Sequence, residues 1–135
     1  MDLTTLLAFE DYKEGLKALY ERYDLTLGYK DYDASEEETI QYLNSNYGWN
    51  TTELWNLDDT ITRFLVSRLY VFYKLDDSTS QEFEEGSWGD ILKSILEGLL
   101  MMLYTKEGFE QPNRDEKIIN DATMLLGKYF RRLWN

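Results

Sequence analysis

The chain contains neither cysteine nor histidine. The first absence excludes disulfides, thiolate nucleophiles and cysteine-based zinc or iron–sulfur sites. The second removes the side chain most often used for acid–base catalysis near neutral pH, which is also the commonest transition-metal ligand. Glycine-rich phosphate loops and serine nucleophile elbows are missing as well. We therefore expect no catalytic residues, no metal site and no cofactor, and a protein that is not an enzyme.

Positive charge and long apolar runs are also scarce. The 14 Lys and Arg residues stand against 26 Asp and Glu, so the net charge is −12. Such a charge repels phosphate backbones and anionic lipid, so we expect a basic protein surface as the partner, and neither nucleic acid nor a membrane. The longest apolar run, Leu99 to Tyr104, is far shorter than the roughly 18 residues of a membrane span. No secretory signal is visible, and the expected location is the cytoplasm.

Proline is almost absent, since Pro112 is the only one, and no low-complexity linker or internal repeat divides the chain. A length of 135 residues is usual for one domain. Aromatic residues make up 16% of the chain, which argues against disorder despite the high charge. The sequence predicts a single acidic helical domain covering residues 1–135.

Apolar residues recur at intervals of three or four along most of the chain, which is the spacing of amphipathic helices. This spacing predicts an all-α fold, an irregular bundle of about five helices. The expected helices are 4–23, 36–46, 53–74 (the central one), 88–105 and 113–133. Residues 24–34 and 76–85 carry turn-forming and acidic side chains and are expected to be loops.

Short polar residues and glycines mark the expected helix ends. Serine, threonine and asparagine side chains accept hydrogen bonds from the first free N–H groups, and glycine adopts the left-handed conformation that ends many helices. The expected N-caps are Ser35 with Glu38 as a capping box, Thr51 or Thr52, and Ser87 with Asp90; the expected terminating glycines are Gly48 and Gly108. Pro112 suits a place in or just before the first turn of the last helix.

Asp58 is the unusual polar residue on the apolar side of the 53–74 helix. We expect it to pair with a base such as Arg68 or Lys128, or to cap a neighbouring helix. A different interpretation is a carboxylate metal site, because helical Mg²⁺-dependent pyrophosphohydrolases bind metal between facing acidic pairs. The residues of such a site would be Asp58, Asp59, Glu82 and Glu85.

The tryptophans Trp49, Trp55, Trp88 and Trp134 stand near expected helix ends. Such a set can mark an interface hot spot, but core packing is the favoured interpretation.

Acidic residues concentrate in two regions. Residues 1–40 hold eleven acids and four bases, and residues 76–97 hold seven acids and one base. Acids interleaved with tyrosines suit capture of a basic surface, because tyrosine supplies contact area and carboxylates pair with guanidinium groups. The expected partner-binding residues are Tyr29, Asp31, Tyr32, Asp33, Glu36, Glu37 and Glu38, with Asp76, Asp77, Glu82, Glu84 and Glu85 extending the same face. The alternative explanation is that these acids only cap a helix or lie in a solvated loop.

Two segments resemble small uncharacterised proteins of tailed bacteriophages. One is Trp55-Asn56-Leu57-Asp58 with the helix that follows it, and the other is the closing Lys128-Tyr129-Phe130-Arg131-Arg132-Leu133-Trp134. With a Trp-led helix over 88–100, the resemblance covers roughly residues 47–134. It implies a phage origin, and hence the cytoplasm of a bacterial host, but it implies no function. The acidic stretch 76–85 departs from the basic or Pro-Gly stretch of the proteins that it resembles.

These observations favour a phage-encoded binding protein that inhibits a bacterial nucleic-acid-handling defence enzyme, of the anti-CRISPR or anti-restriction type. Its acidic, tyrosine-rich face would occupy a basic groove as a nucleic-acid mimic does. One alternative is a structural or assembly accessory that binds other phage proteins. A second alternative is a divalent-metal-dependent hydrolase, which would lose metal binding on Asp58→Asn.

Overall fold

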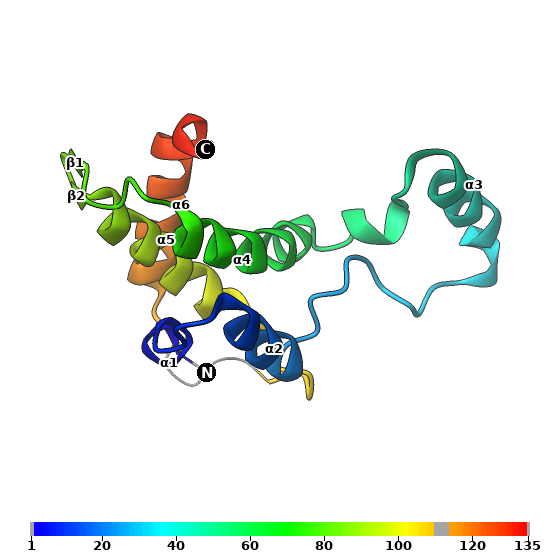
Figure 1. Ribbon diagram of the computed structural model, residues 1–135. Coiled ribbons are helices and arrows are strands. Elements are labelled where there is room, and N and C mark those ends of the chain that lie inside the picture. Colours follow the sequence, from blue (N-terminus) through cyan, green and yellow to red (C-terminus); the bar gives the residue numbers. More distant parts are fainter. Residues whose placement is uncertain (1, 110–113, 135) are drawn as a thin grey trace.

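The computed structural model describes residues 2–109 and 114–134. Its regular secondary structure within these ranges is helical apart from one short hairpin, and loops connect the elements (Figure 1). The helices are α1 (Leu3–Leu7), α2 (Tyr12–Arg22), α3 (Glu37–Tyr47), α4 (Leu57–Leu75), α5 (Trp88–Met102) and α6 (Glu116–Tyr129). Three 3-10 turns accompany them, η1 (Ala34–Glu36), η2 (Thr51–Leu54) and η3 (Phe130–Arg132). Strand β1 (Glu82–Phe83) pairs antiparallel with β2 (Gly86–Ser87). The predicted all-α class is confirmed.

Helix α5 is the centre of the fold, rather than the 53–74 helix that we expected there. Ten of its fifteen residues are buried, and α6, α4 and α1 pack around it. Gly98 allows the close approach of α6, because a Cβ at this position would collide with the side chain of Ala122. Full burial of a side chain such as Leu96 contributes roughly 1.5–3 kcal/mol, so this apolar helix dominates the stability of the core.

The first expected helix is two helices. Asp2 accepts a hydrogen bond from the N–H of Thr5 at 2.9 Å and begins α1. Asp11 accepts one from the N–H of Lys13 at 2.9 Å and begins α2. The prediction of one helix over 4–23 is wrong because Asp11 is better placed as an N-cap than inside a helix.

The caps of α5 and the end of α3 agree with the sequence. Ser87 Oγ accepts a hydrogen bond from the N–H of Asp90 at 3.1 Å. Gly48 has a φ of 78° and ends α3 in the left-handed conformation. The expected cap Ser35 is wrong, since it lies inside η1 and α3 begins after Glu36 without a side-chain cap.

The segment before α4 also differs from the prediction. Asn50, rather than Thr51 or Thr52, is the cap, and it forms a capping box with Glu53. Its side chain accepts from the N–H of Thr52 at 2.9 Å, while Glu53 accepts from the N–H of Asn50 at 2.9 Å. This box closes the short turn η2, so α4 begins only at Leu57.

The last two helices are shorter than expected. Helix α5 ends at Met102, and Gly108 belongs to a later turn in which it has a φ of 84°. Asp115 caps α6 by accepting from the N–H of Lys117 at 2.9 Å. The prediction for Pro112 lies outside the described residues.

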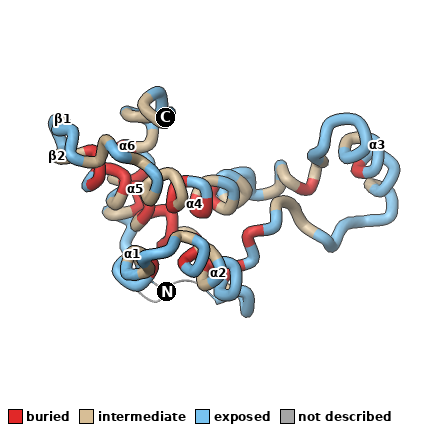
Figure 2. The backbone as a smooth tube through the Cα atoms, viewed as in Figure 1, coloured by how far each residue is buried: buried red, intermediate tan, exposed pale blue. Residues whose placement is uncertain are grey.

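Residues 29–56, which we call the arm, project away from the other helices (Figure 1). Within the arm, α3 packs against η1 and η2, and Ile40 and Thr52 are buried in this small contact. Figure 2 shows most of the arm as exposed, whereas the buried segments gather around α5. The sequence predicted the helix near 36–46 but not its departure from the bundle.

No helix in the described ranges is both long and apolar enough to cross a membrane.

Candidate functional site

Tyr29 and Trp55 join the two ends of the arm. Their rings stack with centroids 6.1 Å apart, and the amide of Asn56 donates a hydrogen bond to the Tyr29 hydroxyl at 3.1 Å. That hydroxyl donates in turn to Asp59 at 3.4 Å. Tyr29 is thus a structural contact at the base of the arm, although the sequence suggested it as a partner-binding residue.

Arg63 ties the chain entering the arm to α4. Its Nη1 donates to the carbonyl oxygen of Thr26 at 3.1 Å, and its Nε pairs with Asp59 at 2.8 Å. Asp24 stabilises the same turn, and the hydrogen bond from the N–H of Thr26 lowers the pKa of its carboxyl. These contacts give the arm a defined direction from the end of α4.

A shallow hollow on the arm combines carboxylates with aromatic walls. Its lining residues are Asp31, Tyr32, Asp33, Glu36 and Trp55. Among the described residues, none of these three carboxylates forms an ion pair. Carboxylates attract a guanidinium or ammonium group, and an adjacent aromatic ring binds it by a cation–π contact. The hollow therefore has the chemistry to take an arginine or lysine side chain.

Helix α3 adds further charge and exposed aromatics beside the hollow. Glu37 and Glu38 lie in its first turn and are exposed, with Glu37 accepting a hydrogen bond from Gln41 at 3.0 Å. Tyr42 and Tyr47 are 58% and 63% exposed and meet edge to face at 6.3 Å. The sequence alone could not show that these two tyrosines are exposed, because helical spacing does not distinguish an aromatic side chain on the surface from one in the core.

The second acidic segment lies at the other end of the molecule from α3 (Figure 1). Lys128 Nζ pairs with Glu84 at 2.9 Å and with Glu85 at 2.6 Å, and the Tyr129 hydroxyl donates to Glu85. These hydrogen bonds lower the pKa of Glu85 and raise the pKa values of Lys128 and Tyr129. Two of the acids expected to contact a partner, Glu84 and Glu85, therefore form ion pairs within the chain instead.

Asp76 has a structural role in the same region. It accepts hydrogen bonds from Ser78 N at 2.8 Å, from Ser78 Oγ at 2.6 Å and from Trp88 Nε1 at 2.8 Å. Burial alone would raise the pKa of this carboxyl, but the hydrogen bonds from Ser78 and Trp88 outweigh it and lower the pKa. The neighbouring Asp77 and Glu82 are exposed.

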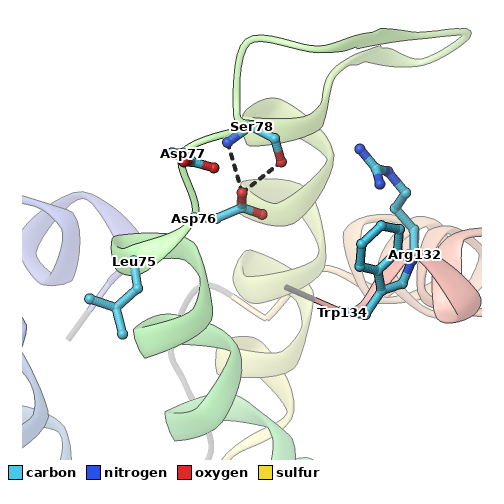
Figure 3. Close-up of a pocket in the computed structure, with 6 residues that line it drawn as sticks. All are labelled: Leu75, Asp76, Asp77, Ser78, Arg132 and Trp134. Carbon is cyan, nitrogen blue, oxygen red and sulfur yellow. Dashed lines mark hydrogen bonds between the residues drawn. The ribbon is translucent and has the colours of Figure 1, made fainter.

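Figure 3 shows Arg132 and Trp134 of the C-terminal segment facing the Asp76–Ser78 turn across a cavity of about 520 Å³. The Arg132 guanidinium lies 5.6 Å from the ring centroid of Phe83 and 5.7 Å from that of Trp88, and it donates to Gln81. Arg132 thus fastens the segment after α6 to the hairpin and to Trp88. The partner-binding residues expected from the sequence consequently form two separate groups, of which only the one on the arm is largely unengaged.

Asp58 is exposed in the first turn of α4, so its predicted place on the core side is wrong. The buried side of α4 carries Thr62, Val66 and Tyr70 instead. The structure also separates the four carboxylates of the metal hypothesis, since Asp58 and the β1 strand lie at opposite ends of α4. In the described ranges, no three acidic side chains gather in a group that could hold a metal ion.

The four tryptophans have different environments. Trp88 is buried and packs edge to face with Phe83 and Tyr129, as the core interpretation expected. Trp55 is half-buried against Tyr29. Trp49 and Trp134 are 42% and 65% exposed, and core packing is wrong for them.

Fold and site together define an all-α chain that carries an acidic, aromatic arm. Comparisons with protein-family models, with curated proteins and with solved structures find no match to the chain. The likeness to phage proteins therefore stays a prediction from the sequence.

Proposed function

We propose that the chain is a phage-encoded binding protein that inhibits a bacterial nucleic-acid-handling defence enzyme. The arm enters a basic groove of that enzyme and occupies the place of the nucleic acid. The observation that carries this proposal is the hollow of Asp31, Asp33 and Glu36 with its aromatic walls Tyr32 and Trp55, on a segment that projects from the folded body.

Charge and shape support this function together. A net charge of −12 attracts basic surfaces at long range, and rings on the arm add contact area once the surfaces meet. A projecting element can enter a groove that the bundle itself is too wide to enter. The arginine and lysine residues that bind phosphates in such a groove would form ion pairs with the carboxylates of the arm instead.

A plating experiment tests the proposal. The chain is expressed in bacteria that carry an active restriction or CRISPR system, and the plating efficiency of a targeted phage is measured against that in bacteria without the chain. We expect the protein to restore plating in at least one such system. Purified protein should bind the corresponding enzyme, and the affinity should fall steeply as salt concentration rises.

A matched pair of charge reversals distinguishes the arm from overall charge. Asp31→Lys with Glu36→Lys alters the hollow, whereas Asp77→Lys with Glu82→Lys makes the same charge change at the other end of the molecule. The first pair should abolish protection and the second should preserve it. Equal loss in both variants would contradict a specific role of the arm.

An assembly accessory that binds other phage proteins is the second candidate, and exposed Tyr47 and Trp49 favour it. An apolar contact of this kind should respond little to salt. Tyr47→Ser with Trp49→Ser should then weaken binding far more than either charge reversal does.

A further inference from the structure

The cavity shown in Figure 3 has walls of opposite charge. The carboxylates of Asp76 and Asp77 lie on one side, and the guanidinium of Arg132 lies on the other beside the ring of Trp134. Its volume of about 520 Å³ falls within the roughly 300–1,000 Å³ that is usual for small-molecule sites. We call it the Arg132 cavity, and its lining residues are Leu75, Asp76, Asp77, Ser78, Arg132 and Trp134.

Arg132 has more donors than the chain satisfies. Among the described residues it forms no ion pair, and its side chain donates to Gln81 alone. Its Nε–H is shielded from water and lacks an acceptor within the same ranges. Buried donors in folded proteins nearly always have an acceptor, so a cationic group with unpaired N–H groups indicates a place for an acceptor from another molecule.

Aromatic rings hold the guanidinium in place without supplying that acceptor. The ring centroids of Phe83 and Trp88 lie 5.6 Å and 5.7 Å from Arg132 Cζ, and that of Trp134 lies 5.6 Å from it. Trp88 is buried, whereas Trp134 is 65% exposed. The ring of Trp134 is therefore a platform on which a flat ligand can stack while the edge of that ligand faces Arg132.

The opposite wall requires N–H donors from a ligand. Both carboxylate oxygens of Asp76 already accept hydrogen bonds, from Ser78 and from Trp88. Asp77 is exposed and forms no ion pair in the described part of the chain. Its carboxylate is therefore available to accept a hydrogen bond from a ligand in the cavity.

The two walls together select the chemistry of the ligand. A molecule that spans them needs acceptors on one edge and N–H donors on the opposite edge of a rigid, flat body. It needs no net charge, because the positive and the negative wall balance each other. A phosphate group on it would be repelled by Asp77 and by the net charge of −12.

We propose that the Arg132 cavity binds uncharged guanine, as the base or as its nucleoside. Guanine carries the acceptors N7 and O6 on one edge and the N2 amine on the other. Arg132 donates to N7 and O6, which is the commonest specific contact of arginine with a base, and Asp77 accepts from the N2 amine. The purine ring stacks on Trp134. This inference goes beyond the proposed function and does not depend on what the arm binds.

Isothermal titration calorimetry of the full chain with three nucleosides tests the site. We expect guanosine to bind at one site per chain. Inosine, which lacks only the N2 amine, should bind about tenfold more weakly, and adenosine, which carries an amine in place of O6, about a hundredfold more weakly. Guanosine 5′-monophosphate should bind more weakly than guanosine, and added salt should reduce the difference. Absence of guanosine binding, or equal affinity for guanosine, inosine and adenosine, overturns the proposal.

Variants of the lining residues test the orientation of the base. Asp77→Asn should weaken guanosine binding about tenfold and change inosine binding little, because inosine has no N2 amine. The control Glu82→Gln removes an exposed carboxylate of the neighbouring hairpin, outside the cavity, and should change neither. Trp134→Ala should abolish guanosine binding, whereas Trp134→Phe should retain most of it because a ring remains for stacking. Circular dichroism must show that each variant keeps its helices. An Asp77→Asn variant that still prefers guanosine to inosine as the natural chain does, or a Trp134→Ala variant with unchanged affinity, overturns the proposal.

Discussion

Asp76 illustrates how single residues of this acidic chain differ in role. Its carboxylate accepts hydrogen bonds from Ser78 and from the indole of buried Trp88. A few residues later, Glu84 and Glu85 both form ion pairs with Lys128. On the arm, by contrast, Asp31 and Asp33 of the hollow are exposed. Acidic residues that look alike in the sequence thus divide into those that hold the fold and those that are free to meet a partner.

The Asp76→Ala variant should unfold more easily than the natural protein. The change leaves the Trp88 Nε1–H without its partner in a buried place, which costs about 1–3 kcal/mol. Urea unfolding followed by circular dichroism measures the free energy of unfolding. Asp77→Ala is the control, and its effect should stay within about 0.5 kcal/mol because its side chain is exposed. Equal effects of the two changes would show that the hydrogen bond to Trp88 contributes nothing.

At the scale of elements, α3 differs from every other helix of comparable length. Helices α2, α4, α5 and α6 all contribute residues to the main apolar core, whereas the one buried residue of α3, Ile40, lies outside it. An isolated helix of eleven residues is marginal in water. The helix therefore depends on its small contact with η1 and η2.

Ile40→Ala should unfold α3 while the rest of the protein stays folded. Loss of a buried isoleucine side chain costs about 2–5 kcal/mol, which is more than this small contact can lose. Hydrogen exchange should show lost protection over residues 37–47 and unchanged protection in α5. Gln41→Ala, at an exposed neighbouring position, should change neither. Loss of protection in α5 as well would show that the arm and the body unfold as one unit.

The whole molecule consists of a body around α5 and an arm that contributes nothing to its main core. No hydrophobic residue between Leu25 and Leu65 belongs to that apolar core or packs against it. The stability of the fold therefore depends mainly on the body, and substitutions on the surface of the arm should affect it little.

Replacement of residues 30–54 by a short Gly-Ser linker should leave the body folded. Tyr29 and Trp55, whose stacked rings join the two ends of the arm, are retained in this variant. We expect a cooperative thermal transition with a midpoint close to that of the natural protein, measured by circular dichroism. The shortened protein should also lose protection in the plating experiment. A broad transition without cooperativity would contradict a body that is stable without its arm.

The sequence by itself determined the helical class, the approximate helices and several of their ends. These features depend on local rules, such as the apolar spacing of α5, the cap Ser87 and the left-handed Gly48. Local rules also explain the errors, since Asp11 and Asn50 were competing caps that apolar spacing alone did not reveal.

Only the tertiary structure decided which side of each helix is buried and which acids stay free. Helix α4 has apolar residues around most of its circumference, so its sequence could not show that Ile61 faces solvent and Val66 the core. The engagement of Glu85 by Lys128 joins residues 43 apart, and no local pattern predicts such a contact. The projection of the arm from the bundle could not be predicted from the sequence for the same reason. Whether a helix joins the bundle depends on the space left by its neighbours, and that space exists only when the whole chain has folded.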